Sequence, residues 1–155
     1  MRYGGVMTPI VRLAAPQDLP DLVALLTKLF AEEADFAPEP ARQRRGLAAI
    51  LAAPEAARIL VAEHDGRCIG MVSLLSTIST AEGGPAAWLE DMVVHPDFRG
   101  AGVGSLLLAA ALDDCRGRGV TRVTLLTDRA NTRAQELYER HGFVGSEMIP
   151  MRRHL

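Results

Sequence analysis

The chain is organised around one stretch, Val93-Val94-His95-Pro96-Asp97-Phe98-Arg99-Gly100-Ala101-Gly102-Val103-Gly104-Ser105. Its apolar start and Pro96 indicate the end of a strand, and the residues after Gly104 repeat at helical spacing. The three glycines in between let a ligand approach the backbone without meeting a Cβ atom. Because the first N–H groups of a helix have no partner inside it, this corner can hold a phosphate, and Arg99 adds a positive charge. The alternative interpretation is a glycine-rich turn that closes a strand–helix corner without a ligand.

Two well-known phosphate loops do not fit this stretch. A P-loop requires Gly-Lys followed by Ser or Thr, and the only lysine of the chain is Lys28. A dinucleotide-binding fingerprint that begins at Gly100 requires a third glycine where Ser105 stands. A nucleotide-binding α/β protein is therefore a disfavoured alternative.

Upstream of the glycine-rich stretch, the residue pattern predicts a strand, two helices and a hairpin. Apolar residues recur at three- and four-residue steps after Asp18, which is typical of an amphipathic helix. Asp65-Gly66 readily forms a tight two-residue turn, so the β-branched runs beside it are predicted to pair. The expected elements are a strand at residues 6–13, helices at 18–30 and 42–53, and paired strands at 58–64 and 67–77.

The second half of the chain alternates between strand and helix patterns. Asn131 is a good N-cap and Gly142 a good stop for the last helix. The alternation predicts an α/β domain with a mixed sheet. The expected elements are strands at residues 86–95 and 120–126, helices at 104–117 and 131–142, and two short last strands at 143–149 and 151–155.

The composition indicates a single folded domain over residues 1–155, because 48% of the residues are hydrophobic and 23% are charged. Seventeen basic and nineteen acidic side chains give a net charge of −2, too balanced for a general nucleic-acid binder. The longest apolar stretch, residues 106–112, is too short to span a bilayer, and no export signal is visible. Cys68 and Cys115 do not lie at metal-ligand spacing. We therefore expect a cytoplasmic protein that binds no metal, membrane or nucleic acid.

Two motifs together resemble the GCN5-related N-acetyltransferase (GNAT) superfamily. The first is Glu90-Asp91-Met92-Val93-Val94-His95-Pro96-Asp97-Phe98-Arg99-Gly100-Ala101-Gly102-Val103-Gly104, which is similar to that family's strand and Arg/Gln-x-x-Gly-x-Gly/Ala pyrophosphate loop. The second is Asn131-Thr132-Arg133-Ala134-Gln135-Glu136-Leu137-Tyr138-Glu139-Arg140-His141-Gly142-Phe143, which resembles the family's later helix. The resemblance implies a mixed, mostly antiparallel sheet of six to seven strands with helices on both faces. It also implies a central splay between two parallel strands that end near Val94 and Leu126.

The resemblance implies that acetyl-CoA binds in this splay. Main-chain groups of the strand would pair with the pantetheine arm, and a main-chain N–H near Met92 or Val93 would polarise the thioester carbonyl. N–H groups of the glycine-rich loop would hold the pyrophosphate, and Asn131 would both cap its helix and meet the cofactor arm. The implied cofactor-binding residues are Met92, Val93, Val94, Arg99, Gly100, Ala101, Gly102, Val103, Gly104, Ser105, Asn131 and Tyr138.

The resemblance also implies candidates for proton transfer. Tyr138 stands where the family often places the acid that protonates the leaving thiolate, and the alternative interpretation is a core aromatic on the helix face that it shares with Leu137. Glu90 is the best candidate to accept the proton of the attacking amine, unless it only binds a cation or supports the structure. Strand alternation predicts that Glu90 and Asp91 point to opposite faces of the sheet. Asp91 and Asp128 are further candidates for the substrate pocket.

The resemblance therefore predicts an acetyl-CoA-dependent N-acetyltransferase that acts by direct attack of a primary amine in a ternary complex. The expected acceptor is a small-molecule amine, and less readily a protein or peptide. The acidic residues Glu32, Glu33 and Asp35 suit a cationic acceptor, or are a solvated helix end. The alternative function is a non-catalytic acyl-CoA-binding regulatory module. A homodimer, paired through residues 151–155, fits the same family resemblance.

Overall fold

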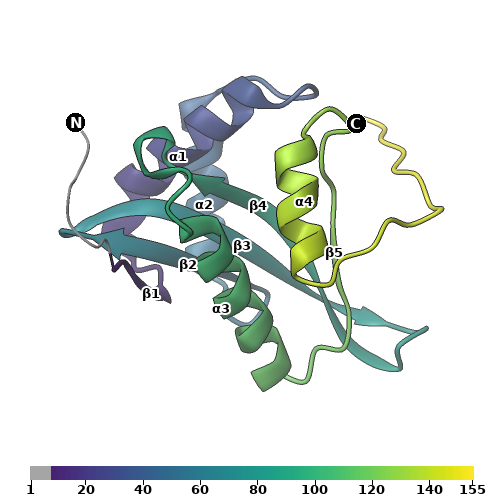
Figure 1. Cartoon of the computed structure of the whole chain (residues 1–155). Coiled ribbons are helices and arrows are strands. Elements are labelled where there is room, and N and C mark those ends of the chain that lie inside the picture. Colours follow the sequence, from purple (N-terminus) through teal and green to yellow (C-terminus); the bar gives the residue numbers. More distant parts are fainter. Residues whose placement is uncertain (1–7) are drawn as a thin grey trace.

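The computed structural model describes residues 8–155, which form one mixed five-stranded sheet and four α-helices (Figure 1). The strand order is β1-β2-β3-β4-β5, and neighbouring strands are antiparallel except β4 and β5, which are parallel. The predicted α/β fold is therefore confirmed. The elements are β1 (Ile10–Leu13), α1 (Leu19–Glu32), α2 (Pro40–Leu51), β2 (Ala57–His64), β3 (Arg67–Ser79), β4 (Gly84–Val94), α3 (Val103–Gly117), β5 (Val123–Leu125) and α4 (Thr132–Arg140).

The β2–β3 hairpin forms at the predicted turn. Asp65 and Gly66 both have positive φ, at 50° and 73°. Positive φ at both central residues matches the right-handed twist of the strands on either side, and Gly66 adopts it without steric cost. The hairpin then continues into the long β3–β4 pairing that forms the middle of the sheet.

Helices cover both faces of the sheet, as predicted, because the strand side chains alternate. In β2, Leu60 and Ala62 pack in a core cluster with α3, and α4 adds its half-buried Leu137 to that cluster. Ile59 and Val61 point the other way and pack in a second cluster with α1 and α2. The sheet thus has two apolar faces, each covered by a pair of helices.

A β-bulge at Glu90 changes which face the later part of β4 presents. Leu74 pairs with Leu89, but the next residue back along β3, Ser73, pairs with Asp91, so Glu90 has no partner on β3. Before the bulge, Leu89 packs in the α3 cluster; after it, Val93 packs in the α1–α2 cluster. The bulge therefore turns Asp91 toward the face of α1 and α2. The expectation that strand alternation separates Glu90 from Asp91 is wrong, because an extra residue interrupts the alternation.

The predicted splay lies next to this bulge. Parallel pairing of β4 with β5 is limited to residues 87–89 and Val123–Leu125. β4 then continues to Val94, whereas β5 ends at Leu125. The two strands therefore separate where β4 carries Met92 and the residues on either side of it.

The two last predicted strands do not form, so the sheet has five strands rather than six or seven. Among the described residues, segment 144–155 pairs with no strand, and Met148 and Ile149 are 87% and 73% exposed. Strand propensity alone does not make a strand, because the backbone needs a neighbouring strand for its hydrogen bonds. Pro150 also lacks an N–H donor. At the other end, the predicted first strand begins at residues 6–7, which lie outside the described residues.

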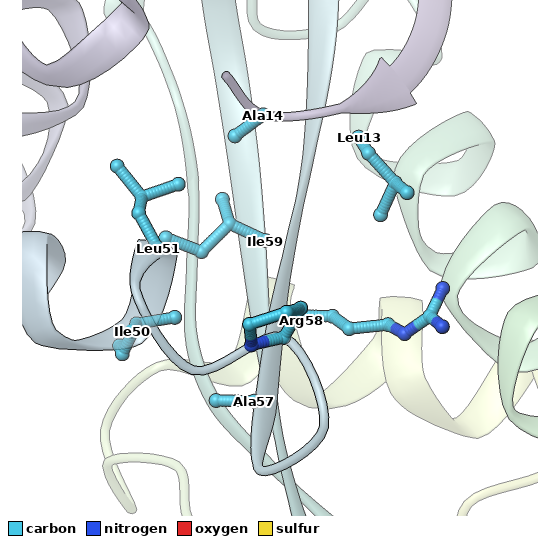
Figure 2. A pocket seen from close by; sticks show the side chains of 8 residues that line it. Leu13, Ala14, Ile50, Leu51, Ala57, Arg58 and Ile59 are labelled. Carbon is cyan, nitrogen blue, oxygen red and sulfur yellow. The ribbon is translucent and has the colours of Figure 1, made fainter. Parts of the chain in front are cut away.

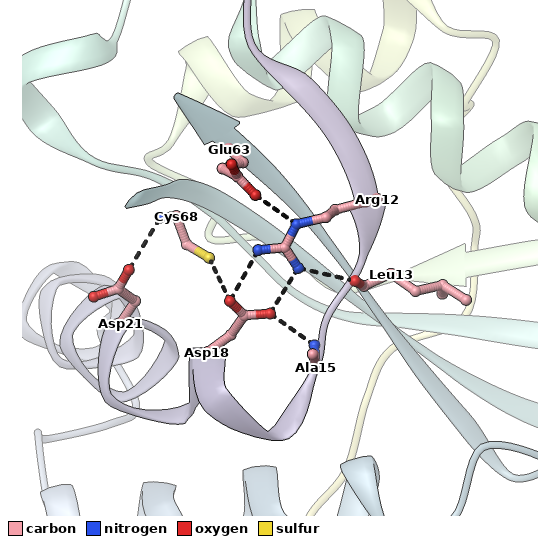
Figure 3. Close-up of polar contacts among 7 residues, drawn as sticks. All are labelled: Arg12, Leu13, Ala15, Asp18, Asp21, Glu63 and Cys68. Carbon is pink, nitrogen blue, oxygen red and sulfur yellow. Dashed lines mark hydrogen bonds and ion pairs between the residues drawn. The ribbon is translucent and has the colours of Figure 1, made fainter. Parts of the chain in front are cut away.

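A network of partly buried ion pairs at the edge of the sheet connects β1 to the start of α1 and to β2 (Figure 3). The Arg12 guanidinium lies 2.8 Å from the Asp18 carboxylate and 2.6 Å from that of Glu63 on β2. The N–H of Cys68 on β3 donates to Asp21 at 3.0 Å. Arg12 holds the pKa of Asp18 down to about 2, chiefly through their hydrogen bonds. This network positions α1, whose far end reaches the site described next.

Candidate functional site

The glycine-rich loop before α3 exposes a row of backbone donors. Gly100 and Gly102 have φ of 80° and 81°, and Gly102 is the N-cap of α3. Within the part of the chain that the structure describes, the N–H groups of residues 100–105 donate to no acceptor. Consecutive free N–H groups at the N-terminus of a long helix form a site for an anion such as a pyrophosphate. The loop thus has the geometry that the sequence predicts.

Gly104 lets three elements meet at this loop. A Cβ atom on Gly104 would lie 3.3 Å from Leu137 Cδ2 on α4 and 3.6 Å from Met92 Cε on β4. Because glycine leaves this space free, the first turn of α3 packs directly against α4 and β4. This close packing brings the glycine-rich loop, the open strand and the helix that carries Tyr138 together.

Arg99 connects the loop to two neighbouring elements. Its Nε donates to the carbonyl oxygen of Val94 at 3.0 Å, at the end of β4. Its Nη2 donates to both carboxylate oxygens of Glu32, at 3.1 and 3.2 Å, at the end of α1. The guanidinium therefore lies beside the row of free N–H groups but is held by Glu32, with which a bound phosphate would compete.

The open edge of β4 supplies main-chain groups to the splay. His95 donates its N–H to the carbonyl oxygen of Ile69 on β3. In an antiparallel ladder every second residue directs its main-chain groups to the same neighbouring strand, so the main chain of Val93 also faces β3. Met92 and Val94 then face the side that β5 has left. Their N–H groups can pair with an extended ligand in the splay, as a strand would.

Asp91 and Glu90 differ in exposure although they are adjacent. The Ser73 hydroxyl hydrogen-bonds to Asp91 Oδ2 at 3.1 Å and also accepts the Asp91 N–H at 3.0 Å. Ser73 is fully buried, and burial together with the charge of Glu90 raises the pKa of Asp91 to about 6. Glu90 lies in the bulge with an exposed side chain. One carboxylate is thus fixed by a buried hydroxyl, while the other is free to meet a substrate.

Glu33 is a site residue that sequence reasoning did not single out from its acidic neighbours. It follows α1 and is half-buried, and its carboxylate has no hydrogen bond or ion pair among residues 8–155. Burial raises the pKa of Glu33 to about 7, and the charges of Asp91, Asp128 and Glu90 contribute to this rise. These four carboxylates come from α1, β4 and the segment after β5. Only the tertiary fold brings them together, so no local motif could have revealed Glu33.

Asp128 connects the segment after β5 to the end of α1 by a hydrogen bond. Its Oδ2 accepts the N–H of Ala34 at 3.2 Å, and its main-chain carbonyl accepts Nε2 of Gln135 at 2.8 Å. Gln135 lies on α4, so Asp128 joins the ends of α1 and β5 to the start of α4. The predicted substrate residue Asp128 therefore shapes the site on the side opposite β4.

Tyr138 lies on α4, where the charge of Glu33 acts on it. Its ring packs edge-on against Phe143 with centroids 5.8 Å apart, and its hydroxyl has no hydrogen bond among the described residues. Burial and the charge of Glu33 raise the pKa of Tyr138 above its ordinary value. The phenol therefore stays protonated at neutral pH and has a proton to donate.

Asn131 and His141 hold the two ends of α4. Asn131 Oδ1 accepts the N–H of Ala134 at 3.1 Å, which confirms its predicted role as an N-cap. One ring nitrogen of His141 lies 2.9 Å from the carbonyl of Leu137 and the other 3.3 Å from the Ser105 hydroxyl. His141 thus connects α4 to the first turn of α3.

A shallow pocket lies elsewhere, between the end of β1, the end of α2 and the start of β2 (Figure 2). Leu13, Ile50 and Leu51 give it an apolar wall, and none of the predicted site residues lines it.

Within residues 8–155, no group of three or more His, Cys, Asp or Glu side chains is placed to hold a metal ion. No described helix is both long and apolar enough to cross a membrane. The free donors and titratable groups gather at the splay instead.

Comparisons with known proteins identify related acetyltransferases. The model of the acetyltransferase (GNAT) family matches residues 19–143. The uncharacterized N-acetyltransferase YhfO of Bacillus subtilis (strain 168) is 38% identical over 85 residues, 55% of this chain and 57% of that protein. The aminoalkylphosphonate N-acetyltransferase of Salmonella typhimurium (strain LT2) is 29% identical over 133 residues, 86% of this chain and 83% of that protein.

A solved structure gives the same result for the fold. An integron cassette protein from the mobile metagenome of Cole Harbour Salt Marsh superposes with a TM-score of 0.81 and 28% identity, over 94% of this chain and 90% of that chain. The chain belongs to the acetyltransferase (GNAT) family. The matched region spans just over half the length of YhfO and 66% of the uncharacterized N-acetyltransferase MJ1207 of Methanocaldococcus jannaschii.

Proposed function

We propose that the protein transfers an acetyl group from acetyl-CoA to a primary amine of a small molecule, by direct attack in a ternary complex. The observation that carries the proposal is the row of free N–H groups at residues 100–105, which opens beside Tyr138 and the carboxylates of β4. An anion-binding loop accounts for a CoA pyrophosphate, and the neighbouring titratable groups account for proton transfer. Two free, buried cysteines support a cytoplasmic location.

Acetyl-CoA would be held mainly by backbone. The N–H groups of residues 100–105 bind the pyrophosphate, and Arg99 adds positive charge once it leaves Glu32. Met92 and Val94 pair with the pantetheine arm along the open edge of β4. Acetyl-CoA supplies the acetyl thioester, whose carbonyl is polarised by the N–H of Met92.

Proton transfer would use side chains on opposite sides of the splay. Glu90, exposed in the bulge, accepts the proton that the attacking amine must lose. Tyr138 donates its phenolic proton to the leaving thiolate, because its raised pKa keeps it protonated at neutral pH. Neither cysteine carries the acetyl group, since burial raises the pKa of Cys115 and brings that of Cys68 to about 12.

The first test is thermal unfolding of the protein with acetyl-CoA, CoA, NAD or ATP. A ligand at 100 times its Kd adds about 2.7 kcal/mol, or roughly 5–11 °C in Tm for a domain of this size. We expect stabilisation by acetyl-CoA and CoA alone, followed by amine-dependent release of CoA thiol. Stabilisation by NAD or ATP instead would contradict the proposed ligand. Binding of acetyl-CoA without thiol release for any amine would indicate the non-catalytic acyl-CoA-binding module.

A further inference from the structure

We propose that a second pocket, beside α1, binds inorganic phosphate in its protonated form. The pocket has a volume of about 200 Å³, several times the share of one water molecule in the liquid, so a tetrahedral oxyanion fits into it. None of the residues assigned above to acetyl-CoA or to proton transfer lines it. Its polar wall consists of Asp21 and Lys28 on α1, Arg67 at the start of β3, and His95 directly after β4.

Two cations line this pocket without a carboxylate partner. Lys28 lies one helical turn before Glu32, but Glu32 pairs with Arg99 at 3.1 Å instead. Arg67 is the first residue of β3 and is exposed. Neither Lys28 nor Arg67 forms an ion pair within residues 8–155. An ammonium and a guanidinium from separate elements are therefore both available to one anion, and a guanidinium binds oxyanions through two parallel N–H groups.

His95 adds a neutral donor to the two cations. Its Nδ1 accepts the N–H of Asp97 at 3.1 Å. In a neutral imidazole one ring nitrogen accepts and the other carries the proton, so this contact makes Nε2 the donor. Nε2 has no acceptor in the described part of the chain, although the side chain is only 21% exposed. The pocket thus collects donors from three elements, which is the arrangement that an oxyanion requires.

Asp21 decides which oxyanion fits. Its Oδ2 accepts the N–H of Cys68 at 3.0 Å, which holds the carboxylate in the wall (Figure 3). At neutral pH inorganic phosphate keeps at least one proton, whereas sulfate keeps none and a phosphomonoester is mostly ionised. The O–H of phosphate donates to Asp21, while its other oxygens accept from Lys28 and Arg67. A fully ionised oxyanion has no proton to donate, so the carboxylate repels it.

The test is calorimetric titration of the protein with inorganic phosphate, sulfate or methyl phosphate at constant ionic strength and neutral pH. Lys28→Gln and Arg67→Gln each remove one cation, and Arg44→Gln on the exposed side of α2 is the matched control. All three variants should keep the wild-type Tm without phosphate, because none of the replaced side chains forms an ion pair in the described residues.

Two further variants separate the possible sites and ions. Gly102→Val alters the glycine-rich loop before α3, the other place where an anion could bind. Asp21→Asn removes the charge of the carboxylate and keeps an oxygen for the N–H of Cys68.

We expect phosphate to bind the wild type with a Kd below about 1 mM, and sulfate and methyl phosphate to bind at least about tenfold more weakly. Lys28→Gln and Arg67→Gln should each raise the Kd for phosphate by about tenfold, whereas Arg44→Gln and Gly102→Val should leave it unchanged. Asp21→Asn should remove the preference for phosphate over sulfate.

Three results would overturn the proposal. The first is no measurable binding of phosphate, or binding that Lys28→Gln and Arg67→Gln do not change. The second is loss of phosphate binding in Gly102→Val alone, which would place the ion at the loop before α3. The third is equal affinity for phosphate and sulfate in the wild type. Acetyl-CoA and thiol release do not enter this test, so its failure is distinct from failure of the proposed function.

Discussion

At the scale of single residues, the titratable groups of the site differ because of where the backbone places them. Asp91 is fixed by the buried Ser73, Glu33 is half-buried without a partner, and Glu90 is exposed in a bulge. Burial disfavours the ionised form, so the pKa values of Asp91 and Glu33 rise to about 6 and about 7. The pKa of Tyr138 rises by the same cause, and the phenol stays protonated. The carboxyl groups of Asp91 and Glu33 therefore titrate close to neutral pH, while the phenol of Tyr138 stays protonated there.

Replacing Tyr138 with Phe tests its role as a proton donor. The variant keeps the ring that packs against Phe143 and removes a hydroxyl with no hydrogen bond in the described residues. We therefore expect kcat to fall by roughly 10²-fold while the Kd for acetyl-CoA and the Tm stay nearly unchanged. Steady-state kinetics and calorimetry measure the two effects. A parallel loss of turnover and acetyl-CoA affinity would make Tyr138 a packing residue.

At the scale of elements, the site exists because α3 begins where β4 and β5 separate. β5 stops pairing at Leu125, so the open edge of β4 and the free N–H groups before α3 face the same gap. Gly104 then allows α4 to pack against the first turn of α3. The bulge at Glu90 turns Asp91 toward α1. Each of these features concerns how two elements meet, and together they assemble groups that are far apart in the chain.

Replacing Gly102 with Val tests the proposed anion-binding role of the loop before α3. Gly102 has a φ of 81°, a conformation that costs a residue with a side chain roughly 1–2 kcal/mol, so the loop should rearrange. We expect acetyl-CoA affinity to fall at least about tenfold by calorimetry.

Gly83→Val is the matched control for Gly102→Val. Gly83 has a similar φ of 74° but lies in the β3–β4 turn, and a Cβ atom added to either glycine would meet no other atom within 4 Å. The control should lose comparable stability and keep acetyl-CoA affinity. Normal affinity in Gly102→Val would rule out the loop as the pyrophosphate site.

At the scale of the whole molecule, the network around Arg12 connects distant parts of the chain. It joins β1 to the start of α1 and to β2 and β3, while the other end of α1 supplies Glu32 and Glu33 to the site. Asp18 is only 13% exposed, so its ion pair with Arg12 is shielded from solvent. The orientation of α1 therefore depends on contacts at the opposite end of the helix from the site.

The pH dependence of stability tests this network. The pKa of Asp18 is about 2 when folded and 3.8 in its ordinary state, so its contribution is present above pH 3.8 and is lost as the pH falls toward 2. Asp18→Asn should therefore lower the free energy of unfolding by about 2 kcal/mol at pH 7, and by progressively less below pH 4.

Urea titrations at several pH values measure this effect, with Asp113→Asn as the control. Asp113 pairs with Arg116, but both side chains are at least 70% exposed, so its loss should change stability by less than about 0.5 kcal/mol. An equal effect of the two substitutions would show that burial does not strengthen the Arg12 pair.

The sequence by itself determined the features that depend on local backbone chemistry. The Asp65-Gly66 turn, the glycine-rich loop before α3, the Asn131 cap and the alternation of strands and helices all follow from residues close together in the chain. Each rests on φ preferences, capping or apolar spacing, which neighbouring residues specify. These local patterns, together with the family resemblance they carry, were enough to predict the α/β fold, the splay and the glycine-rich loop before α3.

Only the tertiary structure decided the features that depend on partners from distant segments. The last two predicted strands are absent because residues 144–155 find no neighbouring strand among the described residues, whatever their propensity. The bulge at Glu90 is a mismatch in register between β3 and β4, which strand periodicity within β4 does not reveal. Glu33 joins the site only because α1 ends beside Asp128 and β4. Charge, burial and register are properties of pairs of segments, so they become defined only when the chain is folded.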